Sequence, residues 1–208
     1  MLVHTMTPQE AFNEWKKDDG QLFPSRLTKW HKNVGKSIKT KTIFPAFYKY
    51  ETKTKRNNKR YMMVRYDSYS DYVHNKNLRA EYSIIDTPKG CRAYIRNYNT
   101  DAFYIYSSHC IKRYVERFAK DVHGADVVHK MIKDNLDAKN LMPFILDKSI
   151  IVRSTYGLFF GRLVDENIVV FTTFVDNDHL FENQIETNEY MKDFSEEYLK
   201  MYREFSKN

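Results

Sequence analysis

The residues best suited to chemistry lie between Ser107 and Lys120, in the stretch SSHCIKRYVERFAK. His109, Arg113 and Arg117 recur there every four residues. An α-helix turns about 100° per residue, so these three side chains fall within about 80° of one another. The other side of the helical wheel carries the apolar residues Ile111, Tyr114, Val115 and Phe118. The pattern predicts a helix that packs through one side and presents a histidine and two arginines to solvent or to a cleft.

An anion is the ligand that such a helix would suit. Ser107 and Ser108 are candidate N-caps, which places His109 in the first turn, where free backbone N–H groups and the helix dipole favour a negative charge and a neutral imidazole. A neutral imidazole can accept a proton near neutral pH. The guanidinium groups of Arg113 and Arg117 can clamp a phosphate and stabilise charge that develops in a transition state. The arrangement therefore indicates phosphate chemistry.

A solvated basic face is the simpler explanation of the same helix. Glu116 lies three residues after Arg113 and four before Lys120, and both spacings allow an ion pair on a helix surface. On that view the arginines would balance nearby carboxylates and bind no ligand.

Cleavage of a phosphodiester also needs an acid that protonates the leaving oxygen. The sequence leaves this role open among several residues with a transferable proton. The candidates are His129, Tyr156, Thr172 and Thr173. We expect His129 to lie off the apolar side of its own helix, which makes plain exposure an alternative explanation for it.

The same helix resembles a motif of known domains. The resemblance rests on Ser108, His109, Arg113, Glu116 and Arg117. Their spacing is similar to the S-x-H-A-x-x-R-x-x-E-R helix of small bacterial domains of unknown function and, more distantly, to the BrnT-type ribonuclease toxins and the broader RelE-like nuclease fold. It covers about Asp101 to Val175 and implies metal-independent RNA cleavage through attack of the neighbouring 2'-hydroxyl, with the histidine and the two arginines in the catalytic and phosphate-binding roles. The chain departs from the pattern through its long N-terminal region, its acidic C-terminal segment, and Cys110 in place of alanine.

A second candidate surface is the basic and aromatic segment Lys36–Tyr61, which contains nine basic residues and a single acidic one, Glu51. Basic groups follow a phosphate backbone and aromatic rings stack on unpaired bases, so this mixture suits single-stranded nucleic acid. We expect the contacts to come from Tyr48, Lys49, Tyr50, Lys53, Lys55, Arg56, Lys59 and Arg60. The alternative is a hairpin whose aromatic residues are core and whose lysines protect an exposed edge.

The N-terminal half predicts helices followed by hairpins. Thr7, Pro8 and Glu10 form a capping box that begins a first helix, and a second helix is expected from about Ser25. The polar tip KRNNK lies between two strand-like stretches, as TPKG does further along the chain, so each predicts a β-hairpin.

The C-terminal half predicts a strand, two helices and a β-meander. DAFYIYSS leads as a strand into the His109 helix, and a second helix is expected over Ala125–Asp137. KSIIVRSTYGLFFGRLVDENIVVFTTFVD then predicts three antiparallel strands, whose buried face the two helices can cover. A charged helix or pair of helices follows from Asp178. The predicted fold class is α+β, with a basic helix and hairpin region over 1–100 and a RelE-like or BrnT-like domain with an acidic C-terminal helix over 101–208.

The charge is unevenly distributed along a chain of net charge +7. Residues 1–100 carry twenty Lys and Arg against nine Asp and Glu, whereas residues 101–208 carry fourteen against eighteen. A polyanion would feel this asymmetry, which predicts a nucleic-acid partner, RNA rather than DNA. An acidic protein partner is the alternative, and the composition of an AT-rich genome would explain the same lysines without any partner.

Other classes of site have no signal in this chain. The sequence has no Gly-rich phosphate loop, no CxxC, no HExxH and no acidic cluster spaced for two metals, so we expect no metal or other cofactor. Only Cys91 and Cys110 are present and no run of about 18 apolar residues occurs, which predicts a cytoplasmic protein without a membrane partner. The sequence therefore predicts a nucleic-acid-binding protein that acts as a metal-independent ribonuclease. The alternative is a non-enzymatic binding or assembly module of a phage or mobile element.

Overall fold

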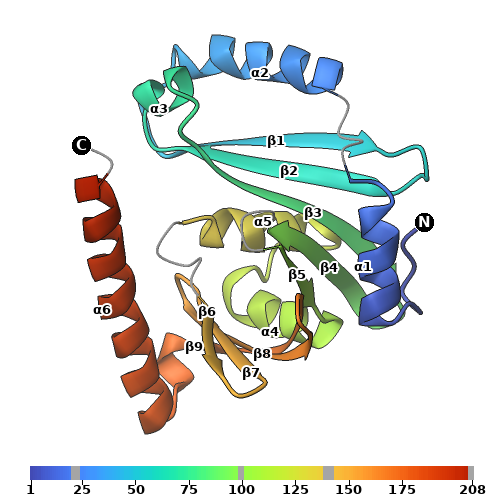
Figure 1. Ribbon diagram of the computed structural model, residues 1–208, viewed down its shortest axis with the longest axis vertical. Coiled ribbons are helices and arrows are strands. Elements are labelled where there is room, and N and C mark those ends of the chain that lie inside the picture. Colours follow the sequence, from blue (N-terminus) through green and yellow to red (C-terminus); the bar gives the residue numbers. More distant parts are fainter. Residues whose placement is uncertain (20–23, 98–100, 138–142, 206–208) are drawn as a thin grey trace.

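The computed structural model describes residues 1–19, 24–97, 101–137 and 143–205, and over these it shows nine strands in one open sheet with six α-helices (Figure 1). The strand order is β1-β2-β3-β4-β5-β9-β8-β7-β6. β5 and β9 pair in parallel, and the other neighbouring strands pair antiparallel. The predicted α+β class is confirmed at this level: a large, mostly antiparallel sheet with helices packed on it.

The elements have the following bounds. The strands are β1 (Ala46–Lys53), β2 (Lys59–Tyr66), β3 (Leu78–Thr87), β4 (Gly90–Asn97), β5 (Ala102–Tyr106), β6 (Pro143–Leu146), β7 (Ser149–Arg153), β8 (Gly157–Asp165) and β9 (Ile168–Asp176). The helices are α1 (Pro8–Lys16), α2 (Pro24–Ile38), α3 (Tyr69–Val73), α4 (Ser108–Phe118), α5 (Ala125–Asn135) and α6 (Glu182–Phe205). A short 3-10 helix, η2 (Asn177–His179), joins β9 to α6.

One sheet runs through both halves of the chain. β4 pairs with β5, with Arg96 opposite Phe103, so the boundary expected near residue 100 falls between two paired strands. β5 then pairs with β9, which brings the hairpins of segment 1–100 and the meander of segment 101–208 into the same layer. Both segments therefore contribute to one sheet.

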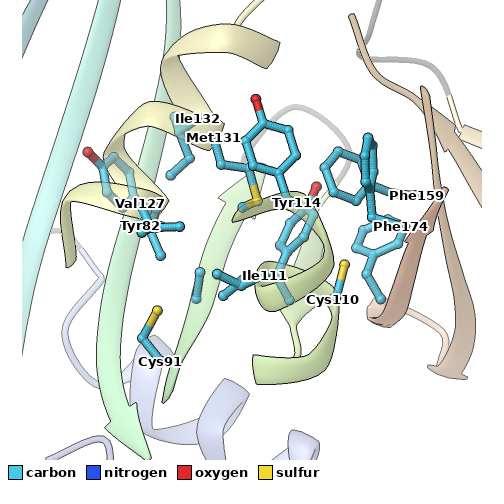
Figure 2. Packing of buried hydrophobic residues seen from close by; sticks show 14 of the residues in the cluster. Tyr82, Cys91, Cys110, Ile111, Tyr114, Val127, Met131, Ile132, Phe159 and Phe174 are labelled. Carbon is cyan, nitrogen blue, oxygen red and sulfur yellow. The ribbon is translucent and has the colours of Figure 1, made fainter. Parts of the chain in front are cut away.

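The main core lies between the sheet and the helices α4 and α5 (Figure 2). Cys110, Ile111 and Tyr114 from α4 are buried there, and Ile111 and Tyr114 lie on the side that the helical wheel predicts to pack. The Tyr114 ring lies 5.3 Å from Phe174 on β9, and its hydroxyl donates a 2.7 Å hydrogen bond to Asp134 on α5. Burial raises the pKa of the Cys110 thiol, which is a packing group. The apolar stripe of α4 thus fixes the direction in which its other side points.

The opposite face of the sheet is covered by α1 and α2. Side chains alternate between the two faces along each strand. α1 inserts Phe12 and Trp15 against Phe103, while α2 packs on Met62 and Val64 of β2. The capping box of α1 is formed as predicted, with Thr7 as its N-cap.

The predicted meander is formed by β7, β8 and β9, in antiparallel order. Gly157 lies where β8 begins, and a Cβ at this position would come within 2.1 Å of the Val175 carbonyl oxygen, so the close approach of β9 requires glycine. β6 and α3 were not predicted. α6 is a single helix, and no helix in the described residues has the length and apolar character needed to cross a membrane.

Candidate functional site

Helix α4 begins where the sequence places it. Ser107 is the N-cap, and its side chain accepts a 3.2 Å hydrogen bond from the backbone N–H of Cys110. The Ser108 hydroxyl lies 2.9 Å from that of Thr87, which holds the β3–β4 turn beside the first turn of the helix. His109 is therefore a first-turn residue of a helix whose start is fixed from two sides.

The first two residues of the predicted polar side of α4, His109 and Arg113, are exposed. The His109 side chain is exposed and makes no hydrogen bond or ion pair with another residue that the structure describes. Arg113 is exposed too, and its Nη1 lies 3.5 Å from Glu116, which also lies 3.8 Å from Lys112. An exposed pair of this kind is weak, so Arg113 can exchange Glu116 for another anion. The ion pairs expected of a solvated basic face are therefore present, but they do not prevent Arg113 from binding another anion.

Arg117, the third residue on the polar side of α4, contacts the end of β9. Its Nη1 forms an ion pair with the carboxylate of Asp176, which is buried. The same carboxylate lies 2.5 Å from Nδ1 of His179, in η2. His179 is exposed and lies next to Arg117, so it continues the polar side of α4 beyond the C-terminal end of the helix. We use the name α4 row for the following five residues: His109, Arg113, Arg117, Asp176 and His179.

The hydrogen bonds determine which nitrogen of His179 is free. Arg117 also approaches Nδ1 of His179 at 2.8 Å, but a guanidinium only donates, so Nδ1 cannot donate to Asp176 and accept from Arg117 at once. The shorter contact to the charged carboxylate favours Nδ1–H donating to Asp176. Nε2 then has no partner among the described residues. Burial alone would raise the pKa of Asp176, but the hydrogen bonds from His179 and Arg117 outweigh it and lower that pKa below its ordinary value.

The sequence interpretation missed Asp176 and His179. The available signal was an aspartate and a histidine three residues apart at the end of a strand-like run, TTFVDNDH. That spacing says nothing about α4, because the contact arises from the packing of α4 on β9. Only the tertiary structure joins Arg117 to this pair.

The candidate proton donors His129, Tyr156 and Thr172 lie away from the polar side of α4 or only near its ends. Nδ1 of His129, on α5, lies 2.8 Å from the Tyr82 hydroxyl, and the ring packs edge-on against Tyr61, so His129 belongs to the interface of α5 with β2 and β3. The ring of Tyr156 stacks on Phe118 at 4.6 Å, near the end of α4. The backbone carbonyl of Thr172 accepts a hydrogen bond from the hydroxyl of the N-cap Ser107. Thr172 thus contacts the start of α4 through its backbone and not through its hydroxyl.

The basic hairpin β1–β2 has an exposed part and a structural part. Lys49, Lys53 and Lys55 are exposed, and Lys49 lies 6.0 Å from the centre of the Tyr61 ring. Lys59 is also exposed but pairs with Glu51 at 3.3 Å. Strand β1 is an edge of the sheet, so the positions of these lysines also agree with the alternative explanation, in which they protect an exposed edge.

Four of the predicted nucleic-acid contacts also make contacts within the fold, and burial corrects the expectation of free side chains for two of them, Tyr50 and Arg60. Tyr50 is buried under α2 and Tyr48 is half-buried there. Arg60 is buried with its guanidinium 3.1 Å from the centre of the Trp15 ring. Arg56 forms a two-pronged pair with Glu14, at 2.8 and 2.9 Å. The sequence predicts free basic and aromatic groups there because it does not show that α1 and α2 cover that face of the hairpin.

The comparisons with known proteins add no family assignment. The chain matches no family model, and the searches of curated proteins and of solved structures found no match. Among the described residues, no group of three or more His, Cys, Asp or Glu side chains is arranged to hold a metal ion.

Proposed function

We propose that the protein binds RNA and cleaves it without a metal ion at the α4 row. The observation that carries this proposal is the continuation of the exposed His109 and Arg113 into Arg117 and the Asp176–His179 pair. Two imidazoles flanking two guanidinium groups supply a base, a phosphate clamp and an acid, the set that phosphodiester cleavage requires.

The chemistry assigns one role to each group. His109 takes the proton of the 2'-hydroxyl, whose oxygen attacks the phosphorus. Arg113 and the remaining N–H groups of Arg117 bind the phosphate oxygens as negative charge grows on them. The bond from phosphorus to the 5'-oxygen breaks, and that oxygen takes the Nε2 proton of His179, which acts as the acid in its imidazolium form with its ring oriented by Asp176. The products are a 2',3'-cyclic phosphate and a 5'-hydroxyl.

The RNA backbone would be held by the exposed lysines of the hairpin. Lys49, Lys53 and Lys55 have no carboxylate partner among the described residues, and the strand on which Lys49 and Lys53 lie is in the same sheet that α4 covers. Counter-ion release from the phosphates would make this binding strongly salt-dependent.

The resemblance to the BrnT-type and RelE-like ribonucleases supports the same proposal. Over the described residues of Asp101–Val175 the chain runs through β5, α4, α5, β6 and the β7–β8–β9 meander, with α4 packed on β9. We propose a distant relation to that fold, in which the N-terminal hairpins and α6 are additions.

A non-enzymatic nucleic-acid-binding module is the second candidate, and one observation favours it. Both arginines of the row already contact a carboxylate, Glu116 or Asp176. In a binding module these pairs would be structural, and the basic hairpin alone would contact the nucleic acid.

Cleavage of a mixed RNA pool in the presence of a chelator tests the proposal. We expect new 2',3'-cyclic phosphate and 5'-hydroxyl ends with the wild type, and about 10²- to 10⁴-fold slower formation of these ends with His109→Ala. An RNA whose cleavage site carries a 2'-deoxy nucleotide should remain intact. Binding without cleavage by the wild type would favour the second candidate instead.

A further inference from the structure

A hollow lies between α2 and the sheet, on the face opposite α4 and α5. Its volume is about 440 Å³, and small-molecule sites range from about 300 to 1,000 Å³. Its walls are mainly apolar and aromatic, with Trp30 from α2 and Met62, Val64 and Tyr66 from β2. Size and walls are those of a site for a small molecule with a flat, apolar body.

The charge of the hollow has one sign. None of the described residues that line it is acidic, whereas Lys32 and Arg79 are cationic. Arg79 lies opposite Val64 in the β2–β3 register, and cross-strand partners share a face of the sheet, so its side chain belongs to the face that α2 covers. Arg79 makes no hydrogen bond or ion pair with another described residue. An anionic group at the rim would give this guanidinium its partner.

A third feature is a buried polar atom. Nε2 of His31, which lines the hollow, is buried and has no hydrogen-bond partner among the residues that the structure describes. Buried polar atoms are paired in the great majority of cases, so one without a partner calls for an explanation. A ligand atom that hydrogen-bonds this nitrogen supplies one.

The imidazole of His31 is held in a fixed position. Its ring stacks on Tyr72 of α3 at 4.9 Å, and the Tyr72 hydroxyl donates to the His31 carbonyl at 3.3 Å. A Cβ on Gly35 would come within 2.1 Å of that hydroxyl, so glycine allows α2 to lie this close to α3. A group held in place before binding loses little entropy when the ligand arrives.

We propose that this hollow binds a small aromatic anion. Its ring lies against Trp30 and the β2 side chains, one of its polar atoms pairs with Nε2 of His31, and its anionic group pairs with Arg79. A mononucleotide and an aromatic carboxylate both have this chemistry. The site lies on the other face of the sheet from the α4 row and does not depend on RNA cleavage.

Titration of the full chain with AMP, adenosine, salicylate and inorganic phosphate, followed by calorimetry or by NMR of the ligand, tests the proposal. We expect AMP or salicylate to bind, and the tighter of the two identifies the source of the anion. Arg79→Met, which keeps an apolar stem, should weaken that binding about tenfold, the scale of a charge-assisted hydrogen bond. His31→Phe should weaken it too, while the control Arg162→Met, at an exposed residue of β8, should not.

Any of three results would overturn the proposal. The first is the absence of binding by both AMP and salicylate to folded wild type. The second is binding that stays unchanged in Arg79→Met, and the third is adenosine binding as tightly as AMP, because either shows that no anion is recognised here. Arg79 is exposed, so its variant should fold, and thermal unfolding of each variant checks this.

Discussion

Nδ1 of His179 lies 2.5 Å from the buried carboxylate of Asp176, and the same carboxylate pairs with Arg117 of α4. One acidic group thereby joins the end of β9 to the polar side of α4. It leaves the second ring nitrogen of His179 without a partner in the described part of the chain. A carboxylate that orients a histidine in this way can fix which nitrogen transfers a proton.

Asp176→Asn should therefore impair cleavage while RNA binding persists. The amide no longer holds Nδ1–H of His179 as a carboxylate does, and part of a proton-transfer contribution of about 10²- to 10⁴-fold is lost. Rates of RNA cleavage at saturating RNA measure the effect. His179→Ala should cost at least as much, and the double variant no more than His179→Ala alone, because both changes act through one group. Additive losses would show that Asp176 does not act through His179.

The hairpin lysines should control affinity and its salt dependence. In Lys53→Ala/Lys55→Ala the slope of log affinity against log salt should fall by about one for each lost phosphate contact. Titration of labelled single-stranded RNA at several salt concentrations measures this slope. Lys192→Ala, on the acidic helix α6, is the matched control and should change nothing. Tyr50→Phe should also bind normally, since Tyr50 is buried under α2. A flat salt response in the wild type would contradict the proposed surface.

The contact of α1 with the hairpin tip should weaken in acid. Arg56 lowers the pKa of Glu14 from its ordinary 4.5 to about 2, against the opposing effect of burial, and the N-terminal amine and Asn58 contribute. Because the folded-state pKa is depressed, its stabilisation is complete above about pH 4.5 and is lost as the pH falls towards about 2. Glu14→Gln should remove this pH dependence and destabilise the fold by about 1 to 3 kcal/mol.

Urea unfolding between pH 2 and pH 7 measures that change. Glu186→Gln, an exposed substitution on α6, should retain the wild-type profile. An unchanged acid profile in Glu14→Gln would show that other groups govern stability in this range.

Tyr114→Phe tests the contact between α4 and α5. The Tyr114 hydroxyl donates to Asp134 at 2.7 Å, and Lys130 remains a partner of that carboxylate at 2.7 Å in the variant. Loss of one partly buried hydrogen bond should cost about 1 kcal/mol of unfolding free energy. Denaturant unfolding measures it, with Tyr69→Phe, at an exposed ring, as the neutral control. No loss in Tyr114→Phe would show that the α4–α5 contact depends on packing alone.

The sequence predicted the features that local pattern determines. The capping box of α1, the two hairpins, the apolar side of α4 and the β7–β9 meander all follow from spacing within one or two elements. The exposure of His109 and Arg113 follows from the same helical wheel.

The features it missed depend on contacts between distant segments. The parallel pairing of β5 with β9 joins residues more than sixty positions apart, and no pattern in either strand specifies it. Arg60 looks like a free cation until Trp15 of α1 covers it. His179 likewise gains a place in the site only because α4 packs on β9.

The most direct measurement is the rate at which a single-stranded RNA is cut in chelator by wild type and by His109→Ala, with RNA affinity measured on the same samples. If His109 is the base, His109→Ala should lose about 10²- to 10⁴-fold in rate while its affinity stays near that of wild type. Equal rates for the two proteins, or no cutting by the folded wild type at RNA concentrations that saturate it, would contradict this proposal.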